Sequence, residues 1–212
     1  MTKKTNVTLL AQLALFSAIL FIMGFTPLGS LPLGGPIVAT LAQIPVVIGA
    51  ILLGTKSGIF LGGVFGFVSM LWFTMYAPPT AFVFSPFYSP QLANGNVGLA
   101  ILYAVCSLLI CFVPRMLIGA VSGPLFRIIH KKTGKVALAA GVAGVAGSLV
   151  NTLLVLLGIL VCFAAPYASV GNSTIWLLLG ASILYNGIPE AIVTPIITIA
   201  VVTPLLHRKK SV

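Results

Sequence analysis

Charged side chains are scarce in this chain, and their positions constrain its fold more than any other feature. The 212 residues contain 11 lysines and arginines but a single carboxylate side chain, Glu190. Only Arg115 and Glu190 lie inside long apolar segments, whereas the other ten charged residues lie at the ends of those segments or between them. A charge at membrane depth costs about 2.5 to 3.5 kcal/mol on insertion scales, so it is usually retained for a partner, a ligand or an ion path. The pattern predicts a membrane protein with a polar site buried among its helices.

The composition excludes a soluble globular domain. Hydrophobic residues make up 59% of the chain and charged residues 6%, and the mean hydropathy is +1.21. The net charge of +10 could suggest a nucleic-acid partner, but the basic residues form short clusters between apolar runs. That distribution is typical of the positive-inside rule and not of a nucleic-acid-binding surface. We therefore expect no nucleic-acid partner.

The apolar runs predict an all-α integral membrane protein, a single domain over residues 1–212 with six transmembrane helices in one bundle. Each run is long enough to cross a hydrocarbon core of about 30 Å. The N-terminal run follows two lysines, as in a signal peptide, but no small-residue cleavage motif comes after it, so we count it as the first span. The predicted spans are residues 7–24, 37–54, 58–76, 97–129, 136–165 and 174–206.

The connecting segments indicate the orientation of the bundle. The 55–57 turn, the 130–135 loop and both termini contain lysine or arginine. The remaining three loops, residues 25–36, 77–96 and 166–173, contain neither. Because short basic loops remain on the cytoplasmic side, the N- and C-termini are expected to be cytoplasmic.

The 77–96 loop has an unusual composition for a segment exposed to water. It is rich in proline and carries the apolar residues Phe82, Val83, Phe84, Phe87 and Tyr88. One interpretation is that it folds back as a lid or packs on the top of the bundle. The other is an aromatic belt at the membrane interface. Phe84 and Tyr88 are candidate substrate-binding residues under the first interpretation.

Small residues recur at helical spacing in three spans. Such residues let helix backbones approach closely in lipid, so packing within this chain is the main expectation for the glycines. The alanines of the first span form either an outward docking edge for another membrane protein or an internal packing edge. The residues concerned are Gly54, Gly58, Gly62 and Gly66, then Gly141, Gly144 and Gly147, and the alanines Ala11, Ala14 and Ala18.

Polar residues of three spans are expected at one membrane depth. At 1.5 Å per residue, Arg115 and Asn151 each lie about 24 Å from the inner basic residues, and Glu190 about 27 Å. Asn186 is four residues before Glu190 and shares its helical face, with Tyr185 beside it. These residues therefore form one candidate constellation in the outer part of the membrane.

Three interpretations of this constellation remain open. Arg115 and Glu190 could form a purely structural ion pair. Alternatively, Arg115 faces a carboxylate or phosphate in a binding pocket open to the outside, since its planar guanidinium suits such groups. Asn151, Asn186 and Glu190 would then hydrogen-bond hydroxyl or amide groups of the ligand. The third interpretation is a proton path through Glu190.

The residues for other chemistries are missing from the sequence. His130 and His207 lie at the inner ends of spans, and no nucleophile motif or phosphate-binding loop is present. The three cysteines, Cys106, Cys111 and Cys162, lie in apolar runs without metal-ligand spacing and are expected to pack as small apolar residues. We expect no catalytic residue, no metal site and no cofactor in this chain, and no enzymatic activity.

Several motifs resemble the substrate-binding S components of energy-coupling factor (ECF) vitamin transporters, in particular the pantothenate-specific branch. The resemblance covers most of the chain and includes the Ala14-xxx-Ala18 edge. A departure is Gln43, where histidine is common in the family. The motifs are GFTPLGSLPLG (24–34), ATLAQIPVVIGAILLG (39–54), PPTAFVFSPF (78–87), FVPRMLIG (112–119) and YNGIPEAI (185–192).

This resemblance implies a multi-pass protein of the bacterial cell membrane that captures a vitamin, here pantothenate, from outside. An S component then docks on a membrane T component driven by two cytoplasmic ATPases, which use the ATP, and it topples to release its cargo inward. The docking surface would be the alanine edge, and Arg115 would bind the carboxylate.

Alternative functions are compatible with the same residues. Biotin, lipoate or a nicotinate-like acid would also satisfy Arg115. The chain could instead be a stand-alone secondary carrier, coupled to protons through Glu190. A third class is a non-transporting membrane scaffold, in which the Arg115–Glu190 pair is structural.

Overall fold

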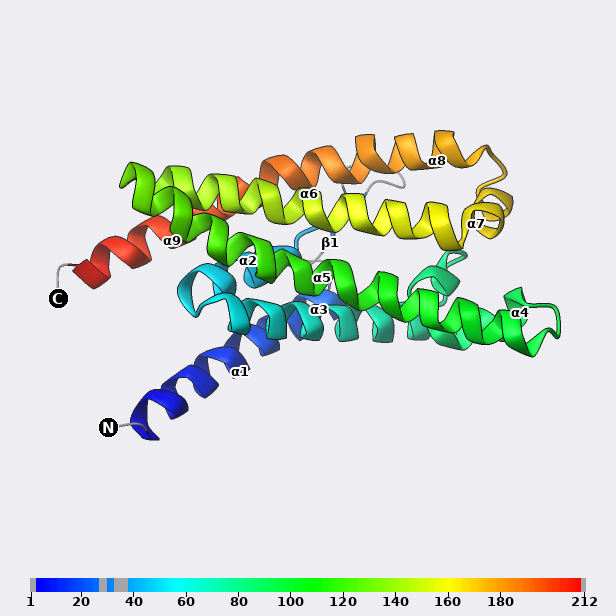
Figure 1. Ribbon diagram of the computed structural model, residues 1–212, viewed down its shortest axis with the longest axis horizontal. Coiled ribbons are helices and arrows are strands. Elements are labelled where there is room, and N and C mark those ends of the chain that lie inside the picture. The colour runs from blue at the N-terminus through cyan, green and yellow to red at the C-terminus, as the bar shows by residue number, and fades with distance from the viewer. Residues whose placement is uncertain (1–2, 27–29, 33–37, 211–212) are drawn as a thin grey trace.

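The computed structural model is a bundle of helices lying roughly along one long axis (Figure 1). It describes residues 3–26, 30–32 and 38–210. The chain enters α1 and leaves α9 at one end of the bundle, whereas α4 (Ser89–Leu92) and α7 (Ala164–Val170) lie at the other end (Figure 1). The five long helices are α1 (Lys3–Phe25), α3 (Thr55–Tyr76), α5 (Val97–Thr133), α6 (Val136–Cys162) and α9 (Ile188–Lys210).

Shorter elements connect the long helices and complete the bundle. Two 3-10 helices precede α4, and a π-helix joins α8 directly to α9. These elements are β1 (Ser30–Pro32), β2 (Val38–Thr40), α2 (Gln43–Leu52), η2 (Ala81–Val83), η3 (Pro86–Tyr88), α8 (Ile175–Ser182) and the π-helix η4 (Ile183–Gly187).

Five of the predicted spans are confirmed as helical segments long and apolar enough to cross a membrane. Four are single helices, and the last runs through α8, η4 and α9. The segments are Val7–Phe25, Thr55–Tyr76, Val97–Thr133, Val136–Cys162 and Ile175–His207.

The predicted second span, residues 37–54, is wrong in its extent. Helix α2 has only 10 residues and rises about 15 Å, half the thickness of a hydrocarbon core. The chain before it forms β2, which pairs antiparallel with β1 so that Ser30 lies opposite Thr40. The apolar run misled the prediction because α2 is buried from Gln43 to Ala50, so its side chains face other helices. The count of six spans and the cytoplasmic termini stay predictions.

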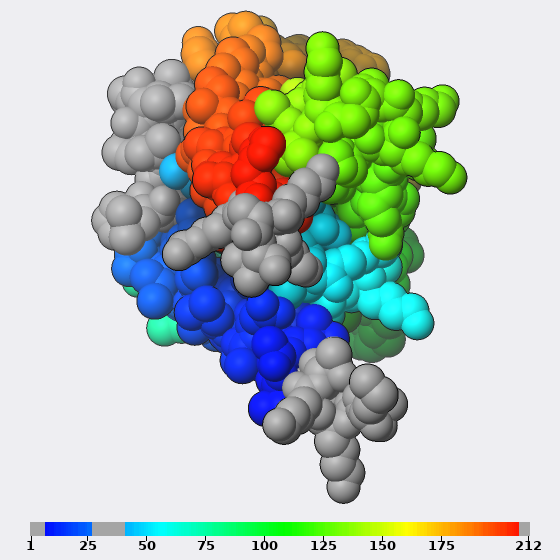
Figure 2. Space-filling model, turned by 90° about the vertical axis from the view of Figure 1, so that its left-hand side faces the viewer, coloured from blue at the N-terminus to red at the C-terminus, as the bar shows by residue number. Residues whose placement is uncertain are grey.

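Helix α2 lies at the centre of the packing. It contacts α3, α5, α6 and α9, while α3 packs on α5, α5 on α6, and α6 on α9. Two buried clusters surround it: Ile44 and Ile48 belong to the first, and Val46 and Val47 to the second. Helix α1 packs chiefly on α3 and α2. It lies at the edge of the bundle when viewed from the end where α1 begins (blue in Figure 2).

Three of the four glycines predicted in the third span bring α3 and α5 into close contact. A Cβ added at Gly62 would overlap the Arg115 carbonyl and lie 2.7 Å from the Met116 Cα, and one at Gly58 would lie 3.0 Å from the Gly119 Cα. At Gly66, the carbonyl accepts a hydrogen bond of 3.1 Å from the Cys111 thiol. No side chain larger than hydrogen fits at these positions without moving a backbone.

Gly54 does not belong to this contact, although helix packing was the expectation for all four glycines. It precedes α3 as its N-cap residue with a φ of 102°, and an added Cβ would meet no atom within 4 Å among the described residues. A positive φ of this size strains residues that carry a Cβ. Gly54 is therefore explained by the turn between α2 and α3 and not by helix packing.

We predict that Gly62→Ala destabilises the protein by about 1 to 3 kcal/mol, because its methyl group forces α3 and α5 apart. The matched control is Gly63→Ala on the next residue of the same helix, where an added Cβ meets no described atom within 4 Å. Thermal unfolding of the purified variants in detergent measures the difference. Equal melting temperatures for the two variants would contradict the close contact.

Candidate functional site

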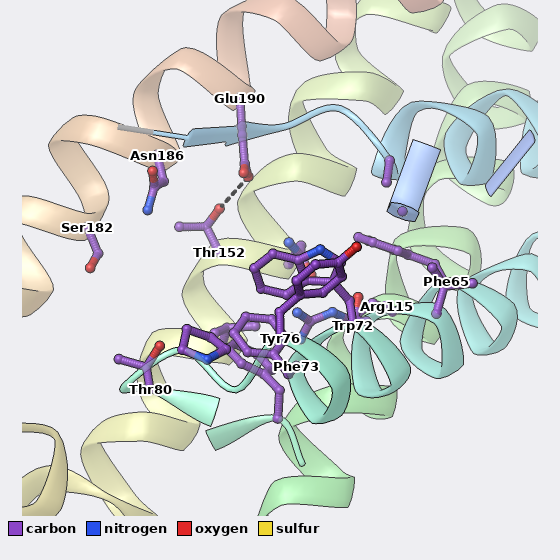
Figure 3. Close-up of a pocket in the computed structure, with 18 of the residues that line it drawn as sticks. Phe65, Trp72, Phe73, Tyr76, Thr80, Arg115, Thr152, Ser182, Asn186 and Glu190 are labelled. Carbon is purple, nitrogen blue, oxygen red and sulfur yellow. Dashed lines mark hydrogen bonds between the residues drawn. The ribbon is translucent and has the colours of Figure 1, made fainter. Parts of the chain in front are cut away.

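A cavity of about 850 Å³ is lined by residues of α1, α3, α5, α6 and α9, among others. Its volume falls within the range of about 300 to 1,000 Å³ common for small-molecule sites. One side is aromatic and the other carries most of the polar groups (Figure 3). The lining residues are Met23, Gly24, Phe25, Thr26, Ala42, Phe65, Val68, Ser69, Trp72, Phe73, Tyr76, Pro78, Thr80, Phe84, Arg115, Asn151, Thr152, Val155, Leu156, Ile159, Tyr167, Ser182, Asn186 and Glu190.

Arg115 is held in this cavity by a local feature of α5. Pro114 has no N–H, so it cannot donate to the carbonyl of Ile110 one turn earlier. The Arg115 Nη1 donates to that carbonyl instead, at 2.7 Å. The guanidinium carbon also lies 4.8 Å from the ring centroid of Phe84 and 5.7 Å from that of Phe65. The Pro-Arg sequence therefore fixes the guanidinium at the cavity wall, although the side chain is only 6% exposed.

Several polar atoms at the cavity are buried and have no hydrogen-bond partner among the described residues. They are Nε of Arg115, Oδ1 of Asn151 and Oδ1 of Asn186. Buried polar groups are almost always hydrogen-bonded in folded proteins. One donor and two acceptors around one cavity are the arrangement expected for a polar ligand.

Glu190 lies across the cavity from the aromatic side, on the first turn of α9 (Figure 3). The Thr152 hydroxyl of α6 donates to its Oε2 at 3.5 Å, and the carboxylate side chain is 5% exposed. Arg115 thus donates to Ile110 within α5, and Glu190 accepts from Thr152 of α6. The structural ion pair, the binding pocket and the proton path all stay predictions.

A π-helix positions the polar side chains that precede Glu190. In η4 the N–H of Ile188 donates to the carbonyl of Ile183, five residues earlier. The following residue is Pro189, which lacks the N–H needed for a regular helical hydrogen bond. Ser182, Asn186 and Glu190 all line the cavity across this irregular turn. Short π-helices within α-helices occur frequently at functional sites.

The aromatic side of the cavity was not predicted. Phe65, Trp72, Phe73 and Tyr76 lie on one face of α3 and line the cavity. Trp72 and Tyr76 stack with ring centroids 5.1 Å apart, and Phe73 lies 4.4 Å from Phe84. The sequence does contain a pattern that indicates this surface. These aromatic residues are spaced three, four and seven residues apart, which places them on a single helical face.

The 77–96 loop folds back onto the bundle. Phe82 and Val83 are buried in a cluster with residues of α5 and α6, and the Phe82 carbonyl accepts a hydrogen bond of 2.6 Å from the Ser107 hydroxyl. Phe84 reaches the cavity from this loop. Phe87, by contrast, is 68% exposed. The packed interpretation is therefore confirmed for residues 81–84.

Two predicted site residues lie outside the cavity lining. Tyr185 is 47% exposed, because the π-helix presents its neighbour Asn186 to the cavity instead. The Tyr88 hydroxyl donates to the carbonyl of Thr74 at 2.9 Å, so this side chain anchors the loop to α3. Arg115, Asn151, Asn186, Glu190 and Phe84 do line the cavity, and their role in binding stays a prediction.

Gln43 occupies the position at which histidine is common in the family that the sequence resembles. Its side chain contributes to helix packing next to the cavity. Its side chain is fully buried, and Nε2 donates to the hydroxyls of Ser148 at 3.2 Å and Thr194 at 2.8 Å. The preceding residue, Ala42, lines the cavity, whereas Gln43 does not. Gln43 thus links α2 to α6 and α9.

The three alanines of the predicted docking edge, Ala11, Ala14 and Ala18, are exposed on α1. In the described part of the chain, no group of three or more His, Cys, Asp and Glu side chains could hold a metal ion. The arrangement at the cavity suits non-covalent recognition: a fixed cation, amide and carboxylate groups, and an aromatic surface.

Comparisons with known proteins agree with this architecture. Residues 8–202 match the family described as ECF transporter, substrate-specific component. The chain is 34% identical over 213 residues to the pantothenic acid transporter PanT of Lactococcus lactis subsp. cremoris (strain MG1363), with 99% of each chain covered. It is 30% identical over 208 residues to the pantothenate transporter PanT of Leuconostoc mesenteroides subsp. mesenteroides, with 91% of each covered.

Both relatives are named as transporters, and the family is a component of transporters and not of enzymes. Together with five helices of spanning length, this makes the chain a multi-pass protein of the bacterial cell membrane. The chain belongs to the family of ECF transporter substrate-specific components.

Proposed function

We propose that this chain binds pantothenate with high affinity from outside the cell and delivers it to an ATP-driven ECF importer. The observation on which the proposal chiefly rests is the guanidinium of Arg115, fixed at the wall of a cavity of suitable size. Pantothenate is the substrate in the names of both relatives. The five spanning segments, with β2 and α2 together as a sixth crossing, are proposed to form a single domain with both termini cytoplasmic.

The chemistry of pantothenate corresponds to the groups around the cavity. Its carboxylate would bind Arg115 through charge-assisted hydrogen bonds. Its amide and two hydroxyl groups would use Asn151, Asn186 and Glu190, which offer acceptors and donors. Its dimethyl-substituted carbon would pack on the aromatic face of α3, which includes Trp72.

The direction of capture follows from the charges at the two ends. The cavity is lined by residues from the loops that lack lysine and arginine, such as Thr26, Thr80 and Tyr167. Lys131 and Lys132, by contrast, lie in the last turn of α5. With the basic end in the cytoplasm, the cavity is accessible from outside.

Release inward is proposed to require partners, because no ATP-binding motif is present in the chain. A membrane T component would dock on the Ala11, Ala14 and Ala18 edge of α1, and two cytoplasmic ATPases would hydrolyse the ATP. Exposure of these small residues on a helix at the bundle edge leaves their surface accessible to a partner helix, which small residues allow to approach closely.

Calorimetric titration of the purified chain with pantothenate tests the proposed function directly. We expect tight, stoichiometric binding without ATP or partners, and none with riboflavin, which has no carboxylate. Biotin serves as a second control because it carries a carboxylate but lacks the hydroxyl pair. Stronger binding of biotin than of pantothenate would assign the cavity to a different carboxylated vitamin.

Arg115→Ala is expected to weaken pantothenate binding at least about tenfold. A hydrogen bond to a charged group contributes about 1.5 to 3 kcal/mol, and 1.4 kcal/mol corresponds to about a factor of ten. Arg127→Ala is the matched control, since it removes the same charge from an exposed position on the same helix. Unchanged affinity in a folded Arg115→Ala sample would exclude the carboxylate assignment.

Ala14→Trp is expected to leave pantothenate binding intact and to abolish ATP-dependent uptake by cells or by reconstituted complexes. The bulky side chain would block the approach of the T component. The control is Leu157→Trp on α6, another exposed apolar position. Simultaneous loss of binding and uptake, or retention of both, would exclude the docking role, and uptake by vesicles containing this chain alone would favour a stand-alone carrier.

A further inference from the structure

Two of the three cysteines meet between neighbouring helices. Cys106 lies on α5, Cys162 is the last residue of α6, and their thiols are hydrogen-bonded to each other. Both side chains are partly buried and pack against one apolar cluster. Packing as small apolar residues, the expectation from the sequence, does not by itself bring two free thiols into contact.

The pairing of α5 with α6 places these cysteines together independently of the thiol contact. The two helices run side by side in opposite directions (Figure 1), and a Cβ added at Gly158 of α6 would lie 2.5 Å from the Cγ1 of Ile110 on α5. Cys106 is four residues before Ile110, and Cys162 is four residues after Gly158. Each cysteine is thus one helical turn further along the same face, so the antiparallel helices place the two opposite each other.

Close helix contacts flank the cysteine pair. A disulfide requires two Cβ atoms about 3.5 to 4.5 Å apart, which bulky side chains between the helices would prevent. Gly158 removes that obstacle one turn away, because a residue without a side chain lets the neighbouring helix approach closely. On the other side of the pair, the ring of Tyr103 stacks on that of Phe163 with centroids 5.4 Å apart. The pair is therefore held between two contacts of the same helices.

The pair lies far from the basic residues at the inner end of the bundle. Helix α6 begins after Lys135 and ends 27 residues later at Cys162, a rise of about 40 Å. With the basic end in the cytoplasm, as proposed above, the pair lies toward the outside of the cell. Disulfides form and persist at cell surfaces, whereas the cytoplasm keeps thiols reduced.

We propose that Cys106 and Cys162 are a redox-active pair, which hydrogen peroxide converts into a disulfide between α5 and α6. The peroxide oxidises one thiol to a sulfenic acid and releases one water molecule. The second thiol then attacks the sulfenic sulfur, the S–S bond forms, and a second water molecule leaves. The two thiols lose two electrons and two hydrogens in total, and one hydrogen peroxide is reduced to two water molecules.

Cys111 is a control supplied by the chain itself. It is buried, and its thiol donates to the carbonyl of Gly66 on α3 at 3.1 Å. It follows Cys106 by five residues, which turns it away from the face that meets α6. Cys111 is therefore expected to stay a free thiol when the other two cysteines are oxidised.

The proposed disulfide would restrain one wall of the cavity. Ile159, one turn before Cys162, lines the cavity. The Phe163 carbonyl accepts a hydrogen bond of 2.8 Å from the N–H of Tyr167, which connects the end of α6 to α7, and Tyr167 also lines the cavity. Fastening Cys162 to α5 would limit the movement of this wall. Building on the proposed function, we expect oxidation to slow the exchange of pantothenate.

Peptide mapping by mass spectrometry tests the redox-active pair. The purified wild-type protein is treated with hydrogen peroxide, its free thiols are blocked with a maleimide, and digests with and without a thiol reductant are compared. We expect one linked peptide that contains Cys106 and Cys162 and that the reductant separates, with Cys111 blocked by the maleimide. Free cysteine in a parallel sample verifies that the peroxide is active.

Three variants assign the link to its residues. Cys106→Ser and Cys162→Ser should each prevent it. Cys111→Ser should still form it, because the serine hydroxyl keeps a donor for the Gly66 carbonyl and leaves the pair intact. Melting temperatures verify that the variants are folded, and the mapping of the wild-type protein is decisive even if one variant is not.

The rate at which bound radiolabelled pantothenate is released measures the effect on the cavity. We expect release from the oxidised wild-type protein to be several-fold slower than from the reduced protein, and to recover with a thiol reductant. Peroxide also forms methionine sulfoxide, which requires a dedicated reductase, so recovery attributes the change to the disulfide. Cys106→Ser should release pantothenate at one rate before and after peroxide treatment.

Thiols that stay free while the peroxide oxidises free cysteine would overturn the redox-active pair. A link through Cys111, or sulfinic and sulfonic acids in place of the linked peptide, would also overturn it. A linked peptide with an unchanged release rate would overturn the effect on the cavity. The absence of pantothenate binding by the reduced protein would instead contradict the proposed function, and the mapping result does not depend on it.

Discussion

The close contact between α3 and α5 is the constraint on which both the packing and the cavity depend. Because Gly62 has no side chain, the Arg115 backbone lies directly against α3. Pro114, one residue earlier, leaves the Ile110 carbonyl to be satisfied by the Arg115 guanidinium. The residues that join the two helices are thus the neighbours of Arg115, which lines the cavity. A change in helix packing here would move the guanidinium as well.

Much of the polar part of the site could be predicted from the sequence. The rise per residue of a helix converts a residue count into a membrane depth. An apolar chain has few polar residues, so those at one depth are expected to lie close together. The residues predicted in this way line one cavity: Arg115, Asn151, Asn186 and Glu190. Tyr185 and Tyr88 lie outside the cavity lining for different reasons. The first assignment assumed a regular helix where η4 is a π-helix. The second depended on the path of a loop, which hydrophobic periodicity does not describe.

The remaining features of the fold and the cavity could not be predicted from the sequence, because apolar side chains occur in three different environments. It can face lipid, another helix or a cavity, and the sequence pattern alone does not distinguish them. The apolar pattern of residues 37–54 therefore predicts a full span, whereas helix α2 is short and buried. The aromatic side chains around Trp72 were likewise compatible with a lipid-facing helix end, although they line the cavity. Tertiary contacts decide between these environments.

The π-helix η4 separates the rotational register of α8 from that of α9. Deleting one residue there would turn α8 by about 100° relative to α9 while leaving Glu190 and the packing below it in place. Such a change would replace the side chains of α8 that line the cavity, including Ser182, with others. The packing of the inner half of the bundle would not change. A single-residue insertion or deletion at this turn would then change the shape of the cavity while preserving the packing of the inner half of the bundle.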